Sequence, residues 1–192
     1  MGLILASGSP RRRELLECSA VPLLAVEPAN IPEVRSSEEE PIAYCQRLAH
    51  QKASVSNRSG HWVLAADTIV VDGTDIFEKP TDSQDAFDML KHISKVGWHD
   101  VVSAWALRYV PLKGEQEVWV EGYSVSKVRF RSLLDAEIRA YISTGEPFDK
   151  AGGYGIQGKG AALVQDIQGS YSNIVGLPLA EVLTALRKYS VI

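Results

Sequence analysis

The stretch WVLAADTIVV, residues 62–71, is the longest apolar run in the chain and decides the fold class. Its β-branched and aromatic side chains predict a buried strand, which Asp72-Gly73 turns into a short return at residues 76–77. Asp67 interrupts this run, and an unpaired buried carboxylate is very costly. We therefore predict that Asp67 meets a cation, a metal ion or several hydrogen-bond donors. The alternative is a structural Asp at a strand end that caps a neighbouring turn.

Strands and helices alternate on both sides of this run. Further strands are expected at residues 3–6, 23–26, 101–110, 118–130 and 161–167. Helices are expected at residues 10–18, 41–55, 82–93, 134–142 and 179–186. The two long strands after residue 100 are joined by a turn at residues 111–114, so they are expected to pair antiparallel. The pattern predicts an α/β fold with a mixed sheet, formed as a single domain over residues 1–192.

The composition narrows the function classes. The chain has 192 residues, of which 45% are hydrophobic, enough for one sizeable core. Its net charge of −4 argues against a nucleic-acid partner, because non-specific DNA binding needs a basic surplus. No apolar run approaches the roughly 18 residues of a membrane span. The 2 cysteines and 4 histidines lack the spacing of a disulfide framework or a zinc site. A cytoplasmic protein without nucleic-acid or membrane partners is expected.

Lys52 is a second charged residue in an apolar setting. In the expected helix at residues 41–55, an apolar stripe at three- and four-residue steps is formed by Ile42, Cys45, Leu48 and Ala49. Lys52 continues that stripe. It is either a buried functional cation or a lysine whose stem follows the helix edge to solvent.

The first helix carries a candidate anion site. The turn Ser7-Gly8-Ser9 joins the strand at residues 3–6 to a helix that starts with Pro10, and Arg11 and Arg12 point toward the buried side of that helix. Free backbone N–H groups and the helix dipole favour a phosphate at such a place. The alternative is a solvated basic turn whose arginines pair with nearby glutamates.

A glycine-rich segment follows at residues 145–160. Within it, GYGIQG at residues 153–158 matches the G-x-G-x-x-G pattern. It does not lie between a hydrophobic strand and a helix, which argues against a dinucleotide-binding or P-loop motif. A glycine-rich loop that lines a ligand is still expected, because glycine permits close approach of the backbone.

Several blocks together resemble the Maf family, in family order and over nearly the whole chain. They are LASGSPRRRELL (5–16), RLAHQKA (47–53), ADTIV (66–70), EKP (78–80), STGEPFDKAGGYGIQGKG (143–160) and GSYSNIVGLPL (169–179). The resemblance implies nucleoside triphosphate pyrophosphatases, which cleave between the α- and β-phosphates with a divalent metal, Mg²⁺ or Mn²⁺. It also implies an elongated two-lobed fold with a deep cleft, similar to the inosine triphosphatase (Ham1) fold.

The resemblance also assigns roles to residues of this chain. It implies that Asp67 is the proton acceptor and that Asp67 and Glu33 hold the metal. The substrate-binding residues that it implies are Ser7, Ser9, Arg11, Arg12, Lys52, Thr68, Lys79 and Gln157. Arg12, Thr68 and Gln157 match the branch of the family that acts on dTTP and UTP, which implies housecleaning of the nucleotide pool.

Other functions stay open at this point. One is a nucleotide-binding regulator of septum formation without turnover. Another is a phosphatase that releases orthophosphate. A pure binder would have no need of a buried base, so Asp67 favours an enzyme. The resemblance also admits a homodimer.

Overall fold

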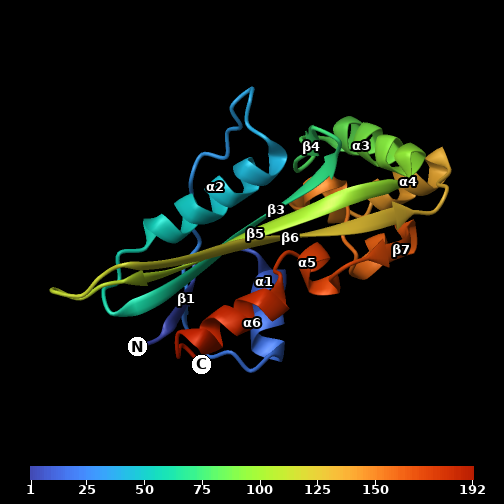
Figure 1. Ribbon diagram of the computed structural model, residues 1–192. Coiled ribbons are helices and arrows are strands. Elements are labelled where there is room, and N and C mark those ends of the chain that lie inside the picture. Colours follow the sequence, from blue (N-terminus) through green and yellow to red (C-terminus); the bar gives the residue numbers. More distant parts are fainter. The chain divides into compact units, whose positions relative to one another are not determined.

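The computed structural model describes all residues, 1–192, as alternating strands and helices (Figure 1). The chain divides into two compact units. Unit 1 comprises Met1–Asp67, Ser103–Ser124 and Gly176–Ile192, and unit 2 comprises Thr68–Val102 and Val125–Val175. The strand order is β2-β1-β3-β5-β6-β7, with β4 paired to β3.

The sheet of unit 1 is built on parallel pairs. β1 (Leu3–Leu5) pairs in parallel with β2 (Leu23–Val26) and with β3 (His61–Asp72). Unit 1 also holds parts of β5 (Trp98–Val110) and β6 (Val118–Phe130). Parallel neighbours need a crossover connection, and the helices that follow β1 and β2 supply it.

Helices lie on both faces of this sheet (Figure 1). α2 (Pro41–Val55) covers one face, and α1 (Pro10–Cys18) and α6 (Leu179–Lys188) cover the other. Side chains alternate between the two faces of a strand, and Ala66 of β3 belongs to the core that α1 and α6 share. Asp67, the next residue, therefore faces α2.

Unit 2 adds antiparallel pairs to the fold. β4 (Asp75–Phe77) pairs with β3, and β7 (Val164–Gln168) pairs with β6. α3 (Ser83–Val96) and α4 (Asp135–Ile142) pack together over a shared core. The shorter elements are α5 (Tyr171–Val175) and the 3₁₀ turns η1 (Glu146–Asp149), η2 (Ala151–Gly153) and η3 (Gly158–Leu163). Parallel and antiparallel pairs occur together, so the predicted α/β class with a mixed sheet is confirmed.

The predicted strand at residues 161–167 starts too early. Residues 161–163 belong to η3, and β7 begins only at Val164. The reason is Glu146, whose carboxylate accepts the N–H groups of Lys159 and Gly160, each at 3.0 Å. These bonds hold the chain in a turn before it can extend.

Two smaller features also differ from the pattern. α5 has five residues and was not predicted. Its polar member Asn173 is fully buried, where its amide donates to the Val101 carbonyl at 3.0 Å. Leu15, Leu16 and Cys18 form the apolar side of α1 in the sequence, yet Cys18 is exposed, because it is the last helical residue and Leu16 makes the core contact instead.

His99 is enclosed in the core of unit 2. It is 2% exposed, its Nε2 lies 2.6 Å from the Tyr154 hydroxyl, and its ring packs edge-on against Phe130. Burial removes the water that would solvate an imidazolium, so it lowers the pKa of His99 from 6.5 to about 4. The folded protein therefore holds His99 in its neutral form at pH 7.

Acid is expected to destabilise the protein through His99. Between about pH 6.5 and pH 4 the unfolded chain binds a proton at this position and the native state does not, so the free energy of unfolding falls as the pH drops. The loss approaches about 3 kcal/mol. Denaturant unfolding at pH 7 and pH 4.5 measures it for the wild type and for His99→Gln. His92→Gln removes an exposed histidine and serves as the control. An equal pH dependence in the wild type and in His99→Gln would contradict this origin of the acid sensitivity.

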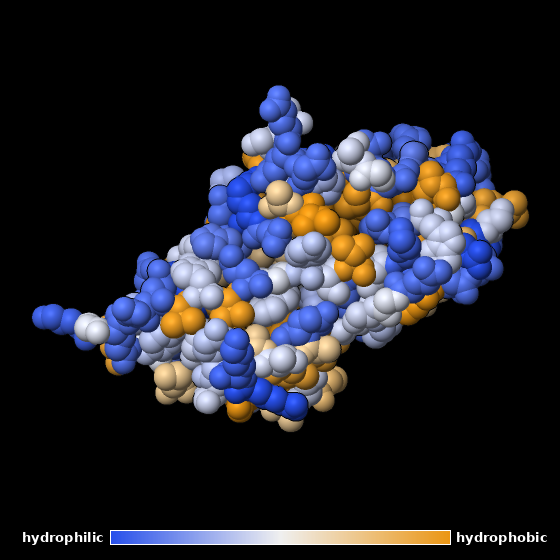
Figure 2. Space-filling model, in the orientation of Figure 1, coloured by the Kyte–Doolittle hydropathy of each residue, from blue (hydrophilic) through white to orange (hydrophobic).

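Hydrophilic side chains cover most of the face shown in Figure 2, and apolar side chains gather there in a few patches. Single exposed apolar residues such as Val34 and Leu134 are normal on a protein surface. None of the 6 α-helices combines the length and the apolar character that a transmembrane helix requires.

Candidate active site

Asp67 is buried where β3 faces α2. Its side chain is only 9% exposed. Oδ1 of Asp67 accepts a hydrogen bond from Lys52 Nζ at 2.6 Å, and Cys45 Sγ lies 4.0 Å from Oδ2. The carboxylate therefore has the cationic partner that its burial requires.

Lys52 joins two carboxylates. It lies in the last turn of α2, on the same buried side as Cys45 and Leu48. Its Nζ is 2.6 Å from Asp67 Oδ1 and 2.6 Å from Glu33 Oε1. The Lys52 side chain is 10% exposed, so it does not follow the helix edge to solvent. The Glu33 side chain is 43% exposed, so the cluster is open to solvent on that side.

The turn after β1 adds a second buried cation. The Arg12 guanidinium donates from Nη1 to Ser7 Oγ at 3.1 Å and from Nε to the Gly176 carbonyl at 2.8 Å. Burial lowers the pKa of Arg12, and the negative charge of Asp67 opposes that shift. Arg12 therefore lies within electrostatic reach of the Asp67–Lys52 pair.

The neighbouring residues of α1 are nearer the solvent. Arg11 is half-buried and Arg13 is exposed. Ser9 occupies the N-cap position, but its side chain makes no capping bond, and its N–H donates to Ser7 Oγ at 3.2 Å. No side-chain cap therefore competes with an anion at the start of this nine-residue helix.

Cys45 is a neighbour of the site that the sequence did not assign. It is fully buried, and burial, with the charge of Asp67, raises the pKa of its thiol. The thiol is therefore neutral and leaves the charge of Asp67 to its cations. The sequence could have indicated this position through the apolar stripe of α2, in which Cys45 lies about two turns before Lys52 and on the same side.

The remaining predicted residues belong to unit 2. Thr68 follows Asp67 in β3 and is half-buried. Lys79 follows β4, is exposed, and makes no hydrogen bond or ion pair. Gln157 is half-buried and directly precedes η3. The hydrogen-bonded cluster around Asp67 is made by residues of unit 1.

The glycine-rich loop that carries Gln157 has a closely packed backbone. Gly152 has a φ of +67°, and a Cβ there would lie 2.9 Å from Val70, so glycine is required. A Cβ on Gly160 would lie 2.3 Å from the Gly155 carbonyl. The segment leads into a 3₁₀ turn rather than an α-helix, which agrees with setting the dinucleotide motif aside.

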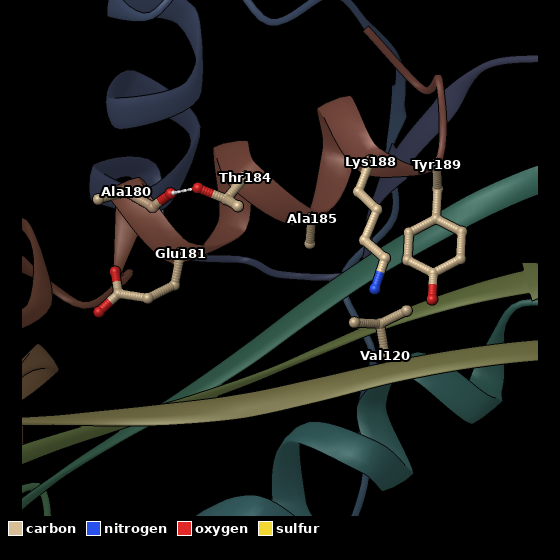
Figure 3. Close-up of a pocket in the computed structure, with 7 residues that line it drawn as sticks. All are labelled: Val120, Ala180, Glu181, Thr184, Ala185, Lys188 and Tyr189. Atoms are coloured by element: carbon tan, nitrogen blue, oxygen red, sulfur yellow. Dashed lines mark hydrogen bonds between the residues drawn. The ribbon is translucent and has the colours of Figure 1, made fainter.

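A hollow of about 400 Å³ lies elsewhere in unit 1, between α6 and β6 (Figure 3). In Figure 3, Lys188 and Tyr189 extend toward Val120, and the Thr184 hydroxyl is bonded to the Ala180 carbonyl. The lining residues are Val120, Ala180, Glu181, Thr184, Ala185, Lys188 and Tyr189. None of the predicted site residues is among them, and the largely apolar lining does not suit a triphosphate.

The carboxylates of the cluster suit a hard cation. Asp67 and Glu33 present oxygens to the same ammonium group, and Mg²⁺ and Mn²⁺ prefer oxygen ligands. No group of three or more His, Cys, Asp or Glu side chains is placed to hold a metal. A metal at Asp67 and Glu33 would therefore need further ligands, such as phosphate oxygens and water.

Comparison with known proteins places the chain in a family. Among solved structures, it matches a HAM1 protein from Coxiella burnetii with a TM-score of 0.47 and 14% identity, over 98% of this chain and 99% of that one. A dTTP/UTP pyrophosphatase of Geobacter sp. (strain M21) is 47% identical over 187 residues, which are 96% of this chain and 94% of that protein. Another, of Halalkalibacterium halodurans, is 45% identical over 96% of this chain and 94% of its own length. The family model described as Maf-like protein matches residues 2–189, so nearly the whole chain fits it and the chain belongs to the Maf family.

Proposed function

We propose that this chain is a nucleoside triphosphate pyrophosphatase that hydrolyses dTTP and UTP to the nucleoside monophosphate and pyrophosphate. The observation that carries the proposal is the buried Asp67–Lys52 pair, with Glu33 on the same ammonium group. Family membership and the names of the relatives support it. We propose further that residues 1–192 act as one Maf-like domain, and that it clears the nucleotide pool in the cytoplasm, where free nucleotides are found.

The phosphates need several cations, because a triphosphate carries about four negative charges. Lys52 and Arg12 are the buried candidates, and the half-buried Arg11 and the exposed Lys79 are the other two. Ser7 and Ser9 line the turn before α1 and are the proposed hydroxyl and backbone contacts.

Asp67 is the proposed general base. It takes a proton from a water molecule whose oxygen attacks the α-phosphorus. The bond from that phosphorus to the bridging oxygen breaks, and pyrophosphate leaves with the electron pair. Lys52 donates to Oδ1 of Asp67, so Oδ2, which the Cys45 thiol contacts only weakly at 4.0 Å, is the proposed proton acceptor. The cations of the site stabilise the charge on the leaving pyrophosphate.

Asp67 and Glu33 are the proposed ligands of Mg²⁺ or Mn²⁺, because both carboxylates lie on the Lys52 ammonium group and are therefore close to each other. When bound, such an ion would neutralise phosphate charge and lower the pKa of a bound water. Lys52 keeps the two carboxylates close together.

Gln157 and Thr68 are the proposed contacts to the base. The imide edge of uracil and thymine offers one donor between two acceptors, and the Gln157 amide can answer with its carbonyl and its NH₂. The Thr68 hydroxyl can take a further contact. Cytosine presents an amine and a bare ring nitrogen instead, which leaves polar groups unpaired.

dTTP and UTP are therefore expected to have the highest kcat/KM among the eight common nucleoside triphosphates. Two mispaired groups at about 1–3 kcal/mol each correspond to a preference over dCTP and CTP of about 30-fold to 10⁴-fold. Pyrophosphate release over the panel, with and without Mg²⁺ and Mn²⁺, measures it. Gln157→Glu loses the amide donor at nearly constant size. It is therefore expected to reduce the ratio of kcat/KM for dTTP and UTP to that for dCTP and CTP.

Each other outcome has a definite meaning. GTP or ATP ranking above both dTTP and UTP would overturn the assignment of the base but not the reaction. Orthophosphate as the product, or tight binding without turnover, would overturn the pyrophosphatase. Light scattering on the same sample tests the predicted homodimer.

A further inference from the structure

The C-terminal end of α2 is held by an arginine of β5. Nη1 of Arg108 donates to the carbonyls of Ser54 and Ser56, each at 3.1 Å, and to that of Ala53 at 3.4 Å. The last carbonyls of a helix have no partner within the helix, and a cation there also meets the negative end of the helix dipole. Arg108 therefore caps α2 from the neighbouring sheet.

Arg108 is itself fixed by Glu117, which directly precedes β6, and by Trp119 of β6. Its Nε donates to Glu117 Oε1 at 2.6 Å, and its guanidinium lies 5.3 Å from the centroid of the Trp119 ring. Trp119 in turn stacks on His50 of α2, with ring centroids 4.1 Å apart. We call Arg108, Glu117, Trp119 and His50 the Arg108 clamp. Only 14% of the Arg108 side chain is exposed, whereas 43% of Glu117 is, so the guanidinium is packed between α2 and Trp119 while its carboxylate partner faces solvent.

Lys52 lies inside the segment that the clamp grips. His50 precedes it by two positions, and Ala53 follows it directly. Helix ends fray unless tertiary contacts hold them. The Nζ of Lys52 has to stay within 2.6 Å of both Asp67 and Glu33, and a frayed last turn would release it from at least one of them.

We propose that Arg108 is a positioning residue for the triphosphate site, which it serves by fixing the last turn of α2 so that Lys52 stays on Asp67 and Glu33. The proposal rests on the proposed function of that site. Ser54 and Val55 are exposed, so water can replace Arg108 at the freed carbonyls. The protein therefore stays folded without the arginine, while Lys52 loses its alignment.

The test compares two arginines that each pair with a carboxylate and lie over a tryptophan ring. Arg108→Gln is expected to lower kcat/KM for dTTP about 10-fold, because small misplacements of a binding group are costly. It should also speed amide hydrogen exchange at residues 52–56. Arg108→Lys keeps a cation at the helix end. It is therefore expected to retain most of the wild-type kcat/KM and most of the protection of residues 52–56 from amide exchange. Arg129 also pairs with a carboxylate, that of Asp166, and lies over a tryptophan, but it caps no helix, so Arg129→Gln should change neither readout.

Dependence on Lys52 separates positioning from a general structural role. In a Lys52→Ala background, Arg108→Gln is expected to reduce single-turnover pyrophosphate release by less than twofold, because the group that it positions is gone. The same 10-fold loss in both backgrounds would overturn the proposal. Unchanged kinetics and exchange in Arg108→Gln would also overturn it.

Two further measurements test the proposal if Arg108→Gln does not fold or if the wild type is inactive. If Arg108→Gln does not fold, Glu117→Gln loosens the clamp while the cation remains, and the same dependence on Lys52 is expected of it. If the wild type releases no pyrophosphate, the proposed function fails. Amide exchange at residues 52–56 still reports then whether Arg108 holds the end of α2.

Discussion

Asp67→Asn is expected to abolish nearly all pyrophosphate release, with kcat lower by about 10²–10⁴. Asparagine matches the size of aspartate, and its carbonyl can still accept the bond from Lys52, which the wild type makes at 2.6 Å. It cannot accept the proton of the attacking water, and it is a poorer ligand for a divalent cation. Steady-state pyrophosphate release and thermal unfolding, measured on the same preparation, check the prediction.

A second aspartate of β3 provides the control. Asp72 lies at the end of the same strand and pairs with the exposed His92 at 2.8 Å. Asp72→Asn should keep the wild-type kcat. If Asp67→Asn also retained near wild-type kcat, Asp67 would be a structural residue.

Lys52→Ala is expected to lower kcat/KM by about 10²–10³, the range seen when one donor to developing charge is removed. Lys52 Nζ lies 2.6 Å from both Asp67 and Glu33, so its loss removes a proposed phosphate cation and the ammonium group that joins the two carboxylates. It also leaves Asp67 buried with less compensation, which is destabilising. Kinetics over a dTTP series and the melting temperature together measure both effects.

Lys52→Met distinguishes the charge from the apolar stem. Methionine fills much of the same space without an ammonium group, so it should keep most of the stability and still show the kinetic loss. A lysine that contributed only its stem would give the opposite result, with lower stability in Lys52→Ala and unchanged kinetics in both variants.

The strongest parts of the site were predictable because they break a pattern. A carboxylate inside an apolar strand and a lysine in an apolar stripe each need a partner, and in the structure Asp67 and Lys52 are partners of each other. Glu33 could be named only by resemblance, since the segment between β2 and α2 has no helix or strand whose period would place it. The role of Arg108 could not be predicted from the sequence pattern, because the helix end that it caps lies more than fifty residues away along the chain.

The two errors in the predicted secondary structure also arise from contacts between residues that are distant in the sequence. The alternation at residues 161–163 favours a strand, but the hydrogen bonds that the N–H groups of Lys159 and Gly160 donate to Glu146 hold the preceding chain in a turn. α5 is too short and too polar for a periodic signal, and it is stabilised by the buried amide of Asn173, which only the tertiary structure reveals.

The layout of unit 1 along the chain sets an order of assembly during translation. Its core combines Leu3 and Leu16 with Val182 and Leu186 of α6, and Arg12 is bonded to the Gly176 carbonyl. The ribosome releases the N-terminal strands first and α6 last of all the helices described. Asp67 and Lys52 can therefore emerge well before Gly176, and a nascent chain that ends before residue 176 lacks the carbonyl that holds Arg12 at the proposed phosphate site. A chain truncated before that point would carry the Asp67–Lys52 pair without the Gly176 contact of Arg12.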